Sequence, residues 1–297
     1  NAGAHLVGPD FLAGQISKEL PVALLIDVEC ELATGVFGIW KAGHFFVLME
    51  AGLPAARHQQ IMEDSEATLI ITSRRHAELA RALVSGEERI IVIDELVDGA
   101  IGQAPLENPL ITLGADSPVC VVYTSGSTGK PKGTIDAHRN FLEMMLVRQE
   151  ILHFSTEDRV GHLTLGSGIS FSLFAALLYG GCWLPFRVKE EGFARFSQWL
   201  IDRRVTISIG GPILRTWLLT LDGRQSFPNI RAIGLGAGPS YVEHLQAFQR
   251  YLPDNAIFLN MYSATEVRSC TLFVMDKTTR LPSRIVPAGY PTLHGTI

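Results

Sequence analysis

The sequence predicts an α/β protein with two stacked, mostly parallel sheets that are covered by helices. Short apolar runs alternate with helix-like segments along most of the 297 residues, and this alternation starts again after residues 151–158. The apolar runs are continuous, as is typical of parallel strands buried on both faces, and regular strand–helix alternation favours a parallel sheet. We therefore expect a first lobe over residues 1–152 and a second lobe over residues 153–297.

The first lobe is expected to hold five buried strands, with helices between and after them. Gly43 follows the first helix, where glycine commonly ends helices. Residues 97–118 contain three prolines and few regular signals, which predicts a surface excursion. The expected strands are 22–27, 45–49, 68–72, 89–94 and 119–123, and the expected helices are 31–42, 53–64, 75–84 and 139–150.

The second lobe repeats the same alternation and then ends with two successive strands. No internal repeat of the residues themselves accompanies this repetition. The expected strands are 160–164, 182–186, 205–209, 230–235, 256–261 and 271–275, and the expected helices are 171–179, 193–203, 213–221 and 241–250.

Composition excludes several classes of protein. Hydrophobic residues make up 47% and charged residues 19%, which is typical of a globular chain with a large core. The net charge of −5 and the lack of a basic run argue against nucleic-acid binding. Four scattered cysteines form no Cys-x-x-Cys pair, and three of them stand in apolar runs, so we expect buried free thiols in a reducing compartment. No long apolar run or signal peptide is evident, so we expect a cytoplasmic protein without a membrane span.

A ten-residue segment, 124–133, has the composition of a phosphate-binding loop. Its sequence is Thr-Ser-Gly-Ser-Thr-Gly-Lys-Pro-Lys-Gly, and it follows the apolar run 119–123. Glycines allow the backbone to approach phosphate oxygens, exposed N–H groups and hydroxyls can donate to them, and lysines supply positive charge. It is not a Walker A loop, because the fifth residue after Gly126 is Pro131. The dinucleotide and nucleophile-elbow patterns are absent here as well.

Two further segments carry residues suited to a nucleotide. Asn260-Met-Tyr-Ser-Ala-Thr-Glu266 ends a predicted strand with an aromatic ring, a hydroxyl and a carboxylate, and a carboxylate is a preferred ligand of Mg²⁺. The glycine-rich turn 234–240 follows another predicted strand and would allow close backbone approach to a planar ring. This turn does not complete a Gly-x-Gly-x-x-Gly pattern, because Tyr241 stands at the last position.

These segments together resemble the adenylate-forming superfamily, which includes acyl-CoA synthetases, nonribosomal-peptide adenylation domains and firefly luciferase. The loop resembles the family signature at every position. Residues 260–266 are similar to the family's Asn-x-Tyr-Gly-x-Thr-Glu, with Ser263 where glycine is usual. Residues 40–57 resemble an early core motif of the family, and residues 286–296 resemble a later proline–glycine segment. The likeness covers nearly the whole chain and implies the family's N-terminal fold.

The resemblance implies binding of ATP with Mg²⁺ and formation of an acyl adenylate. Tyr262 would stack on adenine, Thr265 would contact the α-phosphate, and Glu266 would hold the Mg²⁺ ion. The residues expected to act in catalysis are Lys132, Thr265 and Glu266. Those expected to bind the nucleotide are Thr124, Ser125, Gly126, Ser127, Thr128, Gly129, Lys130, Gly133, Gly236, Ala237, Gly238, Pro239, Asn260 and Tyr262.

The substrate pocket implied by the resemblance lacks a feature of amino-acid-activating members. Those members carry Phe-Asp where this chain has Gly166-Ser167, so no carboxylate is present there to pair with an α-ammonium group. We therefore expect a small carboxylic acid without an α-amino group, either aryl or another acyl type. The expected pocket residues are Gly166, Ser167, Phe171, Ile209, Ile233, Leu235 and Met261, with Ser269 and Cys270 beside them.

The acyl group would pass to a thiol, either coenzyme A or the phosphopantetheine of a carrier-protein domain. The family's ribose-binding aspartate and its C-terminal domain with a catalytic lysine do not occur in these 297 residues. We therefore expect an N-terminal core fragment that binds nucleotide weakly and adenylates poorly by itself.

Other hypotheses remain open. The chain could be a catalytically degenerate nucleotide-binding member, an enzyme that recognises an amino acid's amine atypically, or an unrelated α/β protein with a phosphate loop. Outside the motifs, His138 is expected to face solvent or cap a helix, and His162 is expected to be a core histidine. No cluster of residues has the spacing of a metal site.

Overall fold

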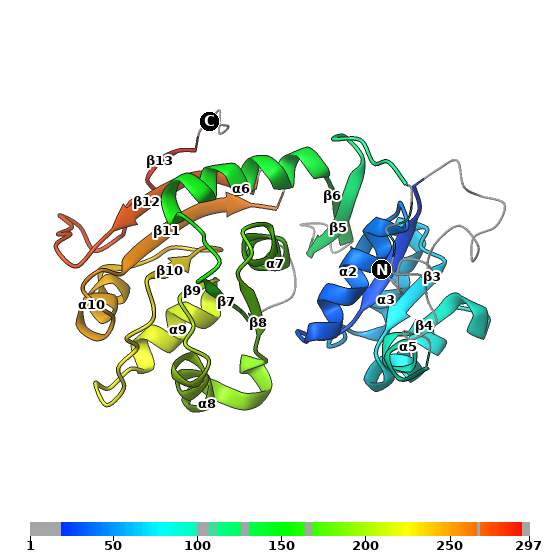
Figure 1. Ribbon diagram of the computed structural model, residues 1–297, viewed down its shortest axis with the longest axis horizontal. Coiled ribbons are helices and arrows are strands. Elements are labelled where there is room, and N and C mark those ends of the chain that lie inside the picture. The colour runs from blue at the N-terminus through cyan, green and yellow to red at the C-terminus, as the bar shows by residue number, and fades with distance from the viewer. Residues whose placement is uncertain are drawn as a thin grey trace. The chain divides into compact units, whose positions relative to one another are not determined.

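The computed structural model describes residues 19–99, 107, 109, 111–125, 131–163, 168–265 and 268–292. Side chains are described for all of these except residues 97–99, 125, 168–171, 268 and 269. The chain divides into two compact units, Asn1–Phe141 and Leu142–Ile297. The boundary lies inside a helix, whereas the lobes predicted from the sequence meet at the end of that helix. Each unit contains one sheet and its covering helices (Figure 1).

The first unit contains a mixed sheet that has six strands in its described part. Five neighbouring strands are parallel, and the last pair, β5 and β6, is antiparallel. Strand β1 has the sequence Pro-Val-Ala-Leu-Leu and is buried along nearly its whole length, as expected of a central parallel strand. In spatial order the strands are β4 (Ile90–Val92), β3 (Leu69–Thr72), β1 (Pro21–Leu25), β2 (Phe45–Leu48), β5 (Pro118–Ser125) and β6 (Pro131–Ala137).

Helices of the first unit bury apolar stripes against this sheet. Helix α2 presents Leu32, Val36 and Ile39 to the core, and Trp40 near its end donates from Nε1 to the carbonyl of Val119 at 2.9 Å. This bond ties the helix to strand β5. The helices are α2 (Cys30–Lys41), α3 (Ala55–Ser65), α4 (Ala77–Arg81) and α5 (Ile93–Gly99), with 3₁₀ turns η1 (Arg74–His76) and η2 (Glu87–Arg89).

The second unit contains a mixed sheet that has seven strands in its described part. Strands β7 to β11 are parallel to one another, whereas β12 and β13 run antiparallel at one edge. In spatial order the strands are β13 (Tyr290–Pro291), β12 (Arg268–Met275), β11 (Ile257–Ala264), β10 (Ala232–Leu235), β9 (Ile207–Gly210), β7 (Arg159–His162) and β8 (Cys182–Pro185).

Helices cover both faces of the second sheet. One face packs against α8, α9 and α10 through a large apolar cluster that includes Phe196, Trp217, Phe248 and Phe258. The other face contacts α7, which lies along β7, β8 and β9, and α6, which reaches β11 through Arg148. The helices are α6 (His138–Leu152), α7 (Gly168–Leu178), α8 (Val188–Asp202), α9 (Pro212–Thr220) and α10 (Val242–Tyr251).

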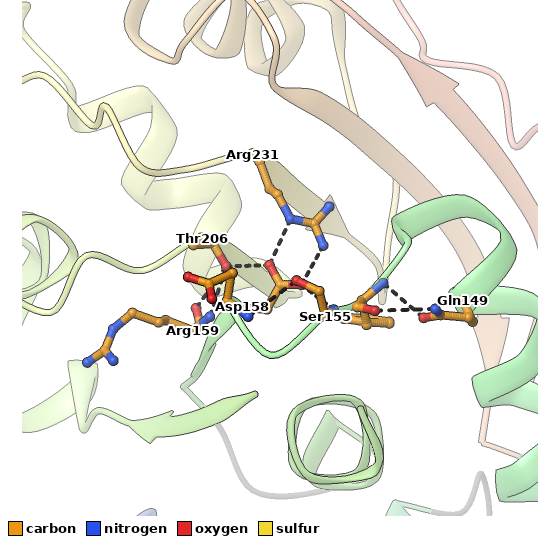
Figure 2. A network of polar contacts seen from close by, with 8 residues as sticks. Gln149, Ser155, Asp158, Arg159, Thr206 and Arg231 are labelled. Carbon is orange, nitrogen blue, oxygen red and sulfur yellow. Dashed lines mark hydrogen bonds and ion pairs between the residues drawn. The ribbon is translucent and has the colours of Figure 1, made fainter. Parts of the chain in front are cut away.

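A buried carboxylate joins three strands of the second sheet where these strands begin. Asp158 precedes β7, and its side chain accepts bonds from Arg231 and Thr206, which precede β10 and β9. Figure 2 shows this network, with Ser155 also donating to Asp158 through its main-chain N–H. The network fixes one end of the strands whose opposite ends carry the predicted site residues.

The predicted class, an α/β protein with two mostly parallel sheets, is confirmed. Some elements differ from the sequence prediction. Residues 131–137 form strand β6, although residues 131–133 were expected to belong to the loop and no strand was expected before the helix at 139–150. Helix α5 and strand β13 were not predicted, and β11 extends three residues beyond the expected strand end, to Ala264. The four cysteines are free thiols, as expected, but only Cys120 and Cys270 are buried, whereas Cys30 is exposed and Cys182 is partly exposed.

Candidate active site

The ends of the predicted phosphate loop form an antiparallel hairpin. Strand β5 ends at Ser125 and β6 begins at Pro131, and Thr124 lies opposite Lys132 in the ladder. Lys132 is exposed. The loop is therefore shorter than the sequence indicated, because Lys132 and Gly133 belong to a strand. The predicted residues Gly126, Ser127, Thr128, Gly129 and Lys130 lie outside the described residues.

Helix α3 holds the end of strand β5 through two polar contacts. Arg57 is half-buried and donates from NH2 to the carbonyl oxygen of Thr124 at 2.9 Å. One residue earlier in the strand, the Tyr123 hydroxyl donates to Asp64 at 2.7 Å. Burial, and then this bond to Asp64, raises the pKa of the Tyr123 hydroxyl. Both contacts come from one helix and immobilise the residues that lead into the loop.

Gly133 allows the second strand of the hairpin to lie close against the first. A Cβ atom at this position would lie 2.9 Å from Val121 Cγ1 and 3.0 Å from Cζ of Tyr123. Any larger residue would push on the ring that bonds Asp64. The glycine at the end of the signature is therefore required by packing in this chain, besides any role toward a ligand.

In the second unit, the predicted nucleotide turn follows strand β10. Gly236, Ala237, Gly238 and Pro239 make a turn in which the last three residues are exposed. Ala237 and Gly238 have positive φ angles of 54° and 135°. Arg215 on helix α9 donates hydrogen bonds to the carbonyls of the first three turn residues. Sequence reasoning missed Arg215, since the contact joins residues more than twenty positions apart.

The predicted motif of residues 260–266 begins near the end of strand β11. The strand is buried up to Met261, after which Tyr262 is 60% exposed. The ladder with β12 shifts register between Tyr262 and Ser263, at the position where the family's glycine is replaced. Asn260 is buried and its side-chain nitrogen donates to the carbonyl of Pro287 at 2.8 Å. Thr265 lies in the turn that follows, and Glu266 lies outside the described residues.

The two segments of this unit that were predicted to bind nucleotide are neighbours. A Cβ atom built on Gly236 would lie 3.6 Å from Cε and 3.7 Å from the carbonyl oxygen of Met261. Met261 directly precedes Tyr262, so the turn after β10 and the exposed ring at the end of β11 share one edge of the sheet. The carboxyl edge of parallel strands is where ligands bind in open α/β sheets.

The sheet register divides the predicted substrate wall between two faces. Ile233 and Leu235 are fully buried in the cluster that packs on helices α8, α9 and α10. Ile209 is paired with Gly234, not with Ile233, so it points to the opposite face. In β11, Asn260 is the register partner of Leu235, and the next residue, Met261, points to the opposite face. Met261 therefore shares the face of Ile209. Ile233 and Leu235 therefore cannot line the same wall as Ile209 and Met261, and their neighbours Gly234 and Gly236 take that face.

The wall that contains Met261 has a buried cationic neighbour. Arg148 on α6 is 5% exposed, and its NH1 donates to the sulfur of Met261 at 2.9 Å. Burial lowers the pKa of this guanidinium to about 10. Sequence reasoning missed Arg148, although it stands on the apolar stripe of its helix with Phe141 and Met145, where an arginine is unusual.

The two histidines differ from each other in their surroundings. His162 is 2% exposed, its Nδ1 lies 2.7 Å from the hydroxyl of Ser172, and burial lowers its pKa to about 3. It is a core histidine, as expected. His138 is half-buried, and its ring lies 5.7 Å from that of Trp40. Burial lowers its pKa as well, so this residue does not simply face solvent.

The remaining predicted substrate residues are only partly described. Gly166 and Ser167 lie outside the described residues, as do the side chains of Phe171 and Ser269, whereas Cys270 is a buried residue of β12. Within the described part of the chain, no group of three or more His, Cys, Asp or Glu side chains could hold a metal ion. No helix in that part is long and apolar enough to cross a bilayer.

Comparison with known proteins gives one family and many relatives. The family model described as AMP-binding enzyme matches residues 10–296. Gramicidin S synthase 1 of Brevibacillus brevis is 25% identical over 98% of this chain, which spans 26% of that protein. Syringomycin synthase SyrB1 of Pseudomonas syringae pv. syringae is 28% identical over 85% of the chain, which spans 41% of it. The chain thus covers less than half the length of these curated relatives.

Solved structures share the fold. The NpsA N-terminal subdomain of Klebsiella oxytoca, in complex with 3-hydroxybenzoyl-AMSN, superposes with a TM-score of 0.78 at 19% identity, covering 98% of this chain and 72% of that one. The N-terminal domain of FACL13 from Mycobacterium tuberculosis gives a TM-score of 0.75 at 20% identity, with coverages of 92% and 70%. At these identities the likeness establishes the fold.

Proposed function

Because the chain belongs to the AMP-binding enzyme family, we propose that it takes part in ATP-dependent activation of a carboxylic acid as an acyl adenylate. One observation carries this proposal beyond family membership. Tyr262, whose side chain is exposed, directly follows Met261, and Met261 lies beside Gly236 of the turn 236–239 at the carboxyl edge of the second sheet. A flat aromatic surface next to a turn with exposed peptide groups is suited to a nucleobase.

The reaction is an in-line displacement at the α-phosphorus of ATP. A carboxylate oxygen of the acid forms the new bond to phosphorus, and pyrophosphate leaves with the electron pair of the broken P–O bond. The protein's contribution is to position the two reactants and to stabilise the developing charge. Lys132 at the base of the phosphate loop would offset charge on the phosphates, and Thr265 would donate to the α-phosphate. Glu266 would hold Mg²⁺, which neutralises phosphate charge when it is bound.

The acid is proposed to lack an α-amino group. Gly166 and Ser167 stand where amino-acid-activating members carry Phe-Asp. In addition, the guanidinium of Arg148 contacts Met261, and a cation disfavours an ammonium ion nearby. Related proteins have been solved with ligands of both kinds. NpsA was solved with a 3-hydroxybenzoyl ligand, whereas FmoA3 was solved with α-methyl-L-serine-AMP.

The acceptor of the acyl group is proposed to be a thiol. The match to gramicidin and syringomycin synthases favours the phosphopantetheine of a carrier-protein domain over free coenzyme A. In that step the thiolate attacks the acyl carbon, a thioester forms, and AMP leaves with the bridging oxygen. Thioester formation on purified carrier protein, compared with coenzyme A, would distinguish the two acceptors.

The test is ATP–pyrophosphate exchange by the intact protein with two panels of acids. We expect exchange with aryl or other acyl acids and none above background with free α-amino acids. Glu266→Gln should abolish exchange, since it removes the proposed ligand of Mg²⁺. Strong exchange with an α-amino acid would overturn the substrate class and favour atypical amine recognition. Binding of ATP without exchange for any acid would instead favour a catalytically degenerate member.

A further inference from the structure

A single guanidinium holds three consecutive carbonyl groups of the turn that follows β10. NH1 of Arg215 donates to the carbonyl oxygens of Gly236 at 2.8 Å and Gly238 at 3.0 Å. NH2 of the same side chain donates to the carbonyl of Ala237 at 2.8 Å. Arg215 lies on helix α9, which connects β9 to β10. Such a fork of donors is a property of arginine that lysine lacks.

The turn adopts a backbone that needs this support. Ala237 has a φ angle of 54°, which costs a residue with a Cβ atom roughly 1 kcal/mol. Three carbonyl oxygens that converge on one point also repel one another unless a cation lies between them. Gly238 has a φ angle of 135°, and a Cβ atom there would approach NH2 of Arg215 to 3.0 Å. The turn and the guanidinium are therefore matched to each other.

The orientation of the carbonyls decides what the turn presents to solvent. A trans peptide is planar, so its C=O and N–H point in opposite directions. Because the carbonyls of Gly236 and Ala237 point at Arg215, the N–H groups of Ala237 and Gly238 point away from it. Both residues are exposed, and neither N–H has an acceptor among the described residues. The turn thus offers two adjacent main-chain donors on its outer face.

We propose that Arg215 is a positioning residue that sets this turn for the nucleoside part of ATP. The inference rests on the proposed function, because it takes a nucleotide as the ligand of this edge of the sheet. In this account the N–H groups of Ala237 and Gly238 donate to acceptor atoms of the base or ribose. Arg215 acts through the backbone of the turn, whereas the phosphates are assigned to other residues, namely Thr265 for the α-phosphate and the loop of residues 124–133 for the phosphates beyond it.

Replacing an arginine that only stabilises the fold should leave nucleotide affinity unchanged, and Arg231 provides this comparison. Arg231 precedes strand β10 and pairs with buried Asp158, whereas Arg215 bonds the turn after the same strand. The two arginines therefore support opposite ends of one strand. Removing Arg231 should destabilise the fold without altering the turn, so it is the matched control for a loss of stability.

The experiment measures binding of AMP and of inorganic tripolyphosphate to the 297-residue chain by titration calorimetry, with thermal unfolding in parallel. Arg215→Gln is expected to raise the Kd for AMP about tenfold, since hydrogen bonds that orient the turn are lost. The Kd for tripolyphosphate should stay within twofold. Arg231→Gln should lower the unfolding temperature and leave both Kd values within twofold. Arg215→Lys should give an intermediate Kd for AMP.

Two results would overturn the inference. One is an unchanged Kd for AMP in Arg215→Gln, and the other is an equal loss of AMP and tripolyphosphate binding. If Arg215→Gln does not fold, Arg215→Lys decides, because an unchanged AMP affinity in that variant contradicts the need for a fork of donors. Failure of the wild-type chain to bind AMP or ATP at all would be a different result, since it contradicts the proposed function itself.

Discussion

The ion pair between Asp158 and Arg231 is expected to be a main support of the second sheet, and Asp158→Asn tests this. The carboxylate is 3% exposed and accepts two bonds from Arg231, both at 2.7 Å. It also accepts from the Thr206 hydroxyl at 2.8 Å and from the Ser155 N–H at 2.9 Å (Figure 2). Asparagine would turn an N–H₂ group toward one of these donors, which leaves at least one donor without an acceptor.

The magnitude follows from burial. Breaking a fully buried pair costs about 3–5 kcal/mol, because the remaining charge is left uncompensated. The Arg231 side chain is 31% exposed, so water screens part of its charge and we expect the free energy of unfolding to fall by about 2–3 kcal/mol. For a unit of this size that corresponds to a decrease of roughly 5–10 °C in Tm.

The pH dependence has a definite sign. Burial alone would raise the pKa of Asp158, but the bonds from Arg231, Ser155 and Thr206 outweigh it and hold that pKa below its ordinary value. A carboxylate with a lowered pKa stabilises the fold above its unfolded pKa of about 4, and this contribution is lost as the pH falls further. The difference in Tm between wild type and Asp158→Asn should therefore be large at pH 7 and shrink below pH 4.

The assay is thermal and urea unfolding at pH 7 and pH 3. The control is Asp222→Asn, which removes an exposed pair with Arg224, at 3.2 Å and with side chains 51% and 86% exposed. That change should cost less than about 0.5 kcal/mol. The reasoning is refuted if Asp158→Asn is no less stable than this control, or if its deficit is as large at pH 3 as at pH 7.

Three further predictions concern single residues. Arg57→Gln removes the donor to the Thr124 carbonyl and should weaken binding of tripolyphosphate about fivefold, with AMP binding unchanged in the same titration. Arg148→Met should change KM for the acid severalfold and leave KM for ATP unaltered, because Arg148 contacts Met261 on the proposed acid wall; equal changes in both would contradict this. His162 has its pKa lowered to about 3 by burial, so it opposes folding increasingly as the pH falls below 6.5. Between pH 6 and pH 4 this protonation should lower the free energy of unfolding of the wild type by up to about 1.4 kcal/mol per pH unit, and His162→Asn should not show this decrease. Urea unfolding measures both pH profiles, and parallel profiles would refute the assignment.

The parallel strands could be predicted from the sequence because burial on both faces gives each a continuous apolar run. Strand β6 could not be predicted in this way. It begins with Pro131, Lys132 and Gly133, which disfavour strands, and it pairs as an edge strand where such residues are tolerated. Composition therefore indicated a loop where the antiparallel ladder continues.

The candidate site shows a similar division. Local motifs were enough to indicate the phosphate loop, the turn after β10 and Tyr262 as candidate nucleotide-binding segments. The direction of each side chain depends on the pleat of the sheet, in which a shift of one residue reverses the face. For this reason Ile233 and Leu235 were placed on a wall that the register assigns to Gly234 and Gly236.

Local motifs did not indicate the contacts that arginines make with residues far away in the sequence. Arg57 reaches Thr124 across 67 positions, and Arg148 reaches Met261 across 113. These contacts connect helices outside the motifs to the segments that the motifs identify. They are the part of the candidate site that required the folded structure.

Transfer of an oxygen isotope tests the central claim, acyl adenylation, most directly. An acid that supports exchange is labelled with ¹⁸O in its carboxylate and incubated with the intact protein, ATP and a thiol acceptor. Attack of the carboxylate on the α-phosphorus, followed by thiol attack on the acyl carbon, leaves one ¹⁸O atom in the AMP, as mass spectrometry would show. Unlabelled AMP, or release of ADP and phosphate in place of AMP and pyrophosphate, would contradict the account.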